Sequence, residues 1–86
     1  MTIINTGHDT VAARAPDGTE YVAIPNYEDK AICVYKVKSG EAAKITGFDA
    51  LPHGAVMAEE ISMHDCKDAA AVRAKCERLI ASIHRT

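Results

Sequence analysis

Short runs of alternating apolar and polar residues fill most of the chain, and turn residues separate the runs. Alternation with a period of two is typical of strands that bury one face. Between the first two runs, Pro16-Asp17-Gly18 is a strong turn signal, because proline presets φ and glycine accepts a positive φ. We therefore expect a hairpin over residues 10–24. The runs predict strands over 10–15, 20–24, 30–38 and 43–48, the last two forming a second hairpin.

Residues 55–63 (AVMAEEISM) fit two periodicities. Alternation places Met57, Glu59, Ile61 and Met63 on one face, whereas helical spacing groups Val56, Met57, Glu60 and Ile61. No capping residue stands at the start of the segment, so we favour a fifth strand.

The C-terminal segment has the spacing of an amphipathic helix. Its apolar stripe consists of Ala69, Val72, Cys76, Leu79, Ile80 and Ile83. Asp65 is a suitable N-cap, because its carboxylate can accept backbone N–H groups of the first turn. These signals predict one long helix from Asp65 to His84.

Together the elements predict an α+β fold in a single domain over residues 1–86. We expect two layers, with an antiparallel sheet of about five strands packed on or around the C-terminal helix. One helix covers one face of a sheet, yet several strands are apolar on both faces. The second face can curl around the helix, pack on a second copy or bind another protein, and the sequence leaves these options open.

The composition and the net charge limit the classes of function that the protein can have. Leu, Phe and Trp together number only three, so the core is thin and burial against a partner is favourable. The net charge is −2 without long runs of either sign, which argues against direct nucleic-acid binding. We expect no export signal and no membrane span, and three cysteines without framework spacing favour reduced thiols in a cytoplasm.

Candidate catalytic groups are few. Cys66 with His64 could form a thiolate nucleophile or redox sensor, but no third orienting group is evident. A metal site could be assembled from His64, Cys66, Cys76 and Cys33, although the spacing is unlike that of zinc sites. Lys36 and Lys38 alternate with Tyr35, so charge and stacking would not share a face of an RNA-binding sheet. We expect no enzyme, no cofactor and no metal.

The sequence favours a protein-binding surface over a catalytic, metal or RNA-binding site. We expect Tyr21, Tyr27 and Tyr35 to act as amphipathic anchors, because aromatic residues are enriched at interface centres. Charged residues flank them on the loop between the hairpins, namely Glu28, Asp29 and Lys30. Tyr21 and Tyr35 can also be half-buried residues of the sheet.

The chain resembles the anti-CRISPR proteins of bacterial phages and mobile elements in five respects. These are its small size, its slight acidity, its five expected short strands, its one helix and its lack of a catalytic constellation. The resemblance covers the whole chain and implies an inhibitor that binds a CRISPR effector complex in the bacterial cytoplasm, blocking DNA recognition or cleavage. Two alternatives remain: a homodimeric structural or accessory bacterial domain, and a thiol-dependent enzyme or redox sensor using Cys66. The sequence does not separate a monomer from a homodimer.

Overall fold

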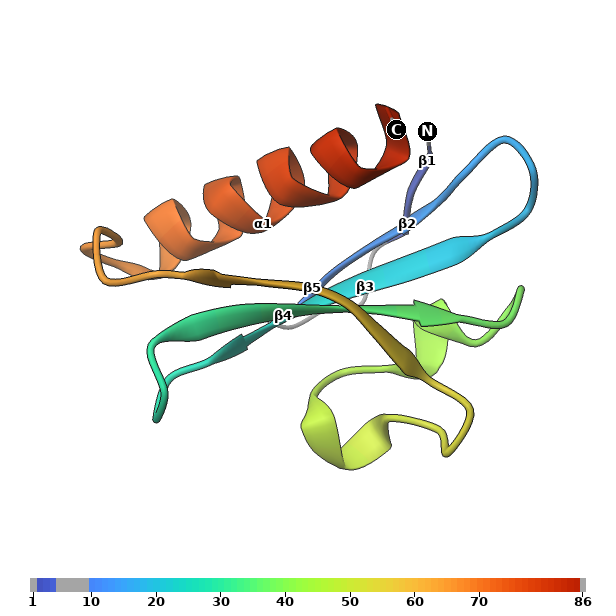
Figure 1. Ribbon diagram of the computed structural model, residues 1–86, viewed down its shortest axis with the longest axis horizontal. Coiled ribbons are helices and arrows are strands. Elements are labelled where there is room, and N and C mark those ends of the chain that lie inside the picture. Colours follow the sequence, from blue (N-terminus) through green and yellow to red (C-terminus); the bar gives the residue numbers. More distant parts are fainter. Residues whose placement is uncertain (1, 5–9, 86) are drawn as a thin grey trace.

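The computed structural model describes residues 2–4 and 10–85, which form an antiparallel sheet and one C-terminal helix (Figure 1). The fold is therefore α+β, as the sequence predicts. The strands neighbour one another in chain order. They are β1 (Thr2–Ile4), β2 (Val11–Arg14), β3 (Glu20–Asn26), β4 (Ala31–Val37) and β5 (Val56–Ser62).

Four of the five expected strands are present. The hairpin over 10–24 is confirmed, with Gly18 at φ 92° in its turn. The third strand continues through Pro25 and Asn26, where Pro25 lies opposite Ile32. Residues 55–63 are confirmed as a strand, β5, which pairs with β4. Strand β1, which pairs with β2, is not among the strands expected from the sequence.

The expected strand over 43–48 is wrong. This stretch holds two short 3-10 helices, η1 (Ala42–Lys44) and η2 (Phe48–Ala50). Local hydrogen bonds close the first of them, because the Lys44 N–H donates to the Glu41 carbonyl and the Ile45 N–H to that of Ala42. As a result β4 has no hairpin partner in this segment and pairs with β5 instead.

Helix α1 (Ala69–Arg85) crosses one face of the sheet (Figure 1). It begins later than predicted, because Asp68 is the N-cap: its Oδ1 accepts the Ala71 N–H at 2.8 Å. Asp65 is not the cap and pairs instead with Lys75 Nζ at 2.6 Å. From the predicted stripe, Val72, Cys76, Leu79 and Ile80 are buried and Ala69 is exposed. The side chain of Ile83 lies outside the described residues.

The two faces of the sheet carry separate hydrophobic clusters. On the helix face, buried sheet residues pack against α1: Val11, Ala13, Ala23, Ile32 and Val34. On the other face, Ala12, Val22, Ile24 and Val37 pack with Ala42 and Ile45 of the segment between β4 and β5. Residues 38–55 therefore cover the face that the sequence left open and form a third layer, so the expected two-layer arrangement is wrong (Figure 1).

A buried carboxylate fastens this covering segment to the sheet. Glu20 is 0% exposed, and its Oε2 accepts the Arg14 Nε–H at 2.7 Å. Its Oε1 accepts the Ala42 N–H at 3.1 Å. Burial by itself raises the pKa of Glu20, but hydrogen bonds from the Gly40 backbone, Arg14 and the Ala42 backbone outweigh it, so the net pKa is lowered. Glu20 is thus held as a carboxylate between the β2–β3 hairpin and the third layer.

This depressed pKa predicts acid sensitivity. In the unfolded chain Glu20 titrates near its ordinary value of 4.5, above its folded-state pKa, so the unfolded state takes up the proton first. The stabilisation by Glu20 is complete above the unfolded-state pKa and is lost as the pH falls through the folded-state pKa. Urea unfolding at a series of pH values should show a steeper loss in the wild type than in Glu20→Gln. Equal slopes would contradict this assignment, since Asp65, whose pKa is also lowered, is present in both proteins.

Candidate functional site

The turn between β3 and β4 displays four consecutive exposed side chains: Tyr27, Glu28, Asp29 and Lys30, here called the turn surface. The side chain of Asn26 organises the backbone beneath them. Its Oδ1 accepts the N–H groups of Glu28 at 3.1 Å and Asp29 at 3.2 Å. Its Nδ2 donates to Asp29 Oδ2 at 3.0 Å. Asn side chains commonly fix turns in this way, so the turn surface is preorganised.

Lys30 completes the turn in an uncommon conformation, with φ at 55°. This is the left-handed region that non-glycine residues seldom occupy. Its carbonyl accepts the Met63 N–H at 2.9 Å, which ties the turn to the end of β5. The turn is therefore held at both ends.

A hollow of about 230 Å³ opens beside the turn surface. Tyr27 and Lys30 form one side of it. The other side comes from the approach to α1 and its first turns: Met63, Cys66, Lys67, Asp68, Ala69 and Val72. Tyr27 is 47% exposed and lines this hollow. The arrangement offers a ring and a recess, the two features that accept a partner's side chain.

The other two predicted anchors lie elsewhere. Tyr21 sits on the helix face of β3, opposite Ala13 and Lys36, and packs on the core beneath α1. Tyr35 lies on the other face and meets Phe48 edge to face, with ring centroids 6.3 Å apart. Burial, then the nearby Cys33 and Glu60, raises the pKa of Tyr35. Of the predicted residues, the structure brings Tyr27, Glu28, Asp29 and Lys30 together and separates Tyr21 and Tyr35 from them and from each other.

Cys66 does not lie in the first helical turn, because α1 begins three residues later. The thiol packs partly against the core, and its Sγ lies 3.9 Å from Asp65 Oδ1. The backbone N–H of His64 donates to Ser62 Oγ at 3.3 Å. Within the described part of the chain, Cys66 thus faces a carboxylate and not an imidazole that could act as its base.

Cys33 and Cys76 are buried. Burial, followed by the hydrogen bond from Cys33 Sγ to Glu60 Oε2 at 3.4 Å and the charges of Glu60 and Asp29, raises the pKa of Cys33 to about 11. A thiol with so high a pKa is almost fully protonated at neutral pH and is a poor nucleophile.

These environments predict selective alkylation. Iodoacetamide at neutral pH should modify Cys66 in the folded protein while Cys33 and Cys76 stay unmodified, because thiolate formation and access are both required. Peptide mass spectrometry would assign the labelled positions, and labelling in urea, where all three should react, is the control. Modification of Cys33 as fast as Cys66 in the folded state would contradict the burial described above.

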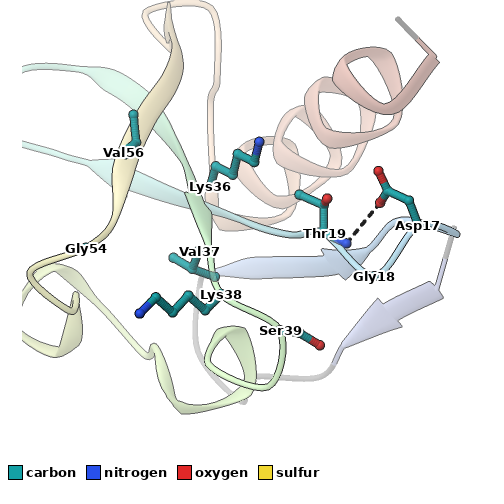
Figure 2. A pocket seen from close by; sticks show the side chains of 9 residues that line it. All are labelled: Asp17, Gly18, Thr19, Lys36, Val37, Lys38, Ser39, Gly54 and Val56. Carbon is teal, nitrogen blue, oxygen red and sulfur yellow. Dashed lines mark hydrogen bonds between the residues drawn. The ribbon is translucent and has the colours of Figure 1, made fainter.

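A larger open hollow, of about 780 Å³, lies where the β2–β3 turn, the end of β4 and the start of β5 meet. Val37 and Val56 supply apolar lining, while Asp17 Oδ1 accepts the Thr19 N–H at 2.9 Å. Figure 2 shows Lys36 and Lys38 pointing in different directions, because β4 ends at Val37 and Lys38 lies beyond the strand, where alternation no longer fixes its direction. The two lysines diverge, so they do not form a shared anion site.

Strand β5 forms a second exposed surface that the sequence analysis missed. All its residues except Ile61 are exposed, and Val56 and Met57 are 63% and 49% exposed. Sequence alternation alone did not reveal this, because exposure depends on β5 lying at the edge of the sheet. Its outer edge is a potential site for strand addition.

Among the described residues, no group of three or more His, Cys, Asp or Glu side chains is placed to hold a metal ion. Helix α1, in the same described part, lacks the length and apolar character that crossing a bilayer requires. Comparison of the chain with protein families, curated proteins and solved structures found no match. The geometry itself is therefore the basis for a functional proposal.

Proposed function

We propose that this protein is a non-enzymatic binding protein that attaches to another protein through the turn surface. The observation that supports the proposal is a half-exposed tyrosine on a turn whose backbone is fixed by Asn26. A fixed turn loses little conformational entropy on binding, so more of the contact energy remains as affinity.

The side chains have the composition of an interface. Tyr27 supplies a large amphipathic ring at the centre, and the hollow beside it can receive a side chain of the partner. Glu28, Asp29 and Lys30 form a charged rim that can orient the partner and select against others. Both signs of charge are present in the rim, which suits a protein partner better than a uniformly charged nucleic acid.

The first partner to test is a bacterial CRISPR effector complex. The resemblance to anti-CRISPR proteins in size, charge and element content supports this choice. In this proposal the protein acts in the bacterial cytoplasm by occupying a surface that the effector needs for DNA recognition or cleavage. The proposal needs no cofactor and no catalytic residue.

The experiment is an affinity capture with tagged protein against purified and lysate-borne effector complexes, followed by mass spectrometry. The wild type should retain effector subunits, and Tyr27→Ala should lose most of them, since a central aromatic anchor is worth about 2 kcal/mol or more. Phe48→Ala is the matched control, because it removes an exposed ring on the opposite side of the sheet. Circular dichroism would verify that each variant is folded.

Three outcomes count against the proposal. Retention of no effector subunit by the wild type contradicts the effector as partner. Equal retention by the wild type and Tyr27→Ala contradicts the turn surface as the binding site. Capture of nothing except further copies of the protein favours the alternative of a homodimeric accessory domain.

A further inference from the structure

The outer edge of β5 has no strand beside it in the described sheet, whose order ends at β5. Edge strands expose a row of unpaired N–H and C=O groups, and proteins protect them with charged side chains, proline, β-bulges or a covering segment. Strand β5 (VMAEEIS) contains no lysine or proline, and its charges are two glutamates in its second half. The register steps from Val34↔Glu59 to Tyr35↔Met57, so Ala58 bulges and divides the strand into two halves.

The two halves differ in chemistry. The first half, Val56 and Met57, is apolar and exposed, and Val56 lies opposite Lys36 of β4. The second half contains Glu59 and Glu60, also exposed. A positive charge from β4 therefore lies beside the first half of the edge strand, and negative charges lie on its second half.

The charges of this edge are complementary to those of a second copy when the two strands run antiparallel. Antiparallel pairing of two β5 strands places the Val56–Met57 half of each beside the Glu59–Glu60 half of the other, whereas parallel pairing places like beside like. Adjacent strands are about 4.8 Å apart, so Lys36, one strand inward, lies about 10 Å from the β5 of the second copy. The side chains of Lys36 and Glu59 project toward the same face, that of α1, and together can span this distance.

We infer that a second copy of this chain occupies the β5 edge, with the two β5 strands antiparallel. Pairing continues the sheet across both copies, satisfies the edge hydrogen-bonding groups and covers Val56 and Met57. A strand pair alone buries less surface than a standard interface, so the dimer is weak and concentration-dependent. This inference does not depend on the turn surface, which uses other residues.

Analytical ultracentrifugation over a wide concentration range tests the inference. The wild type should pass from monomer to dimer as concentration rises. Lys36→Glu and Glu59→Lys should each raise the dimer dissociation constant about tenfold, because each opposes like charges across the pair. The double variant, Lys36→Glu with Glu59→Lys, should return close to the wild-type constant, since it restores opposite charges in exchanged positions.

Wild-type protein that stays monomeric at every concentration would overturn the inference. A double variant no better than the single variants would also overturn it and would leave the edge to a foreign strand. Tyr27→Ala should dimerise as the wild type does, so failure of the turn surface and failure of the edge pairing can be distinguished.

Discussion

Glu20→Ala is expected to destabilise the protein by about 3 kcal/mol, a large fraction of the stability of a small domain. The substitution removes a fully buried carboxylate that accepts the Ala42 N–H at 3.1 Å and the Arg14 Nε–H at 2.7 Å. Arg14 is 51% exposed and can turn to water, but the backbone donors of the covering segment, at Gly40 and Ala42, lose their acceptor. Urea unfolding followed by circular dichroism measures the difference.

Glu20→Gln is the matched control for this prediction. Glutamine keeps an oxygen that can accept from Ala42, but its amide group opposes the Arg14 donor, so we expect an intermediate loss of stability. A loss below about 0.5 kcal/mol for Glu20→Ala would contradict the role assigned to the carboxylate, since that is the range of ordinary surface substitutions.

Ile45→Ala is expected to destabilise the protein by about 3 kcal/mol, as Ile→Ala changes in packed cores do. Ile45 belongs to the covering segment, and its side chain is fully buried against the sheet, among Val22, Ile24 and Val37. Its loss leaves a cavity under residues 38–55. Urea unfolding would measure the change.

Ile80→Ala provides the comparison, because Ile80 is equally buried on the helix face. The two losses should be similar if the covering segment is a layer as well packed as the helix. A small effect of Ile45→Ala beside a large effect of Ile80→Ala would show that the segment does not form part of the core.

Local pattern was sufficient for a tight hairpin and for a helix, the elements whose backbone hydrogen bonds join residues close in the chain. Pro16-Asp17-Gly18 and the flanking alternation predicted the β2–β3 hairpin, and the three-four spacing predicted the buried stripe of α1. For β5, the missing cap decided correctly between helix and strand.

Long-range contacts explain what the sequence did not reveal. Residues 43–48 look like a strand, but the Glu20 carboxylate, 22 positions earlier, binds the Ala42 N–H at the start of η1. Asp65 and Asp68 are equally good caps by type, and the ion pair of Asp65 with Lys75 removes the first from that role. Neither the Glu20–Ala42 contact nor the Asp65–Lys75 ion pair can be recognised from the residues adjacent in the sequence.

The residues predicted to bind a partner show the same limit of sequence reasoning. The stretch Tyr27–Lys30 follows Asn26 directly, so sequence reasoning grouped these residues correctly on one loop. Strand register decides where Tyr21 and Tyr35 point, and it places them on opposite faces. The exposure of Val56 and Met57 depends on strand order, which turn signals do not encode.

In the two proposals, the turn surface and the β5 edge would serve separate tasks. The turn surface would bind a foreign protein through Tyr27 and the hollow beside it, and the edge would join two copies. A dimer of this kind carries two turn surfaces, so a partner with repeated subunits would be bound with increased avidity.

The most direct test of the proposed function is photo-crosslinking in bacterial cells that contain a CRISPR effector complex. A photoreactive phenylalanine derivative replaces Tyr27 in one protein and Ala74, exposed on the outer side of α1, in the control. Crosslinks to an effector subunit from position 27 and none from position 74 are the predicted result. No crosslink from position 27, or equal crosslinking from both positions, would contradict binding through the turn surface.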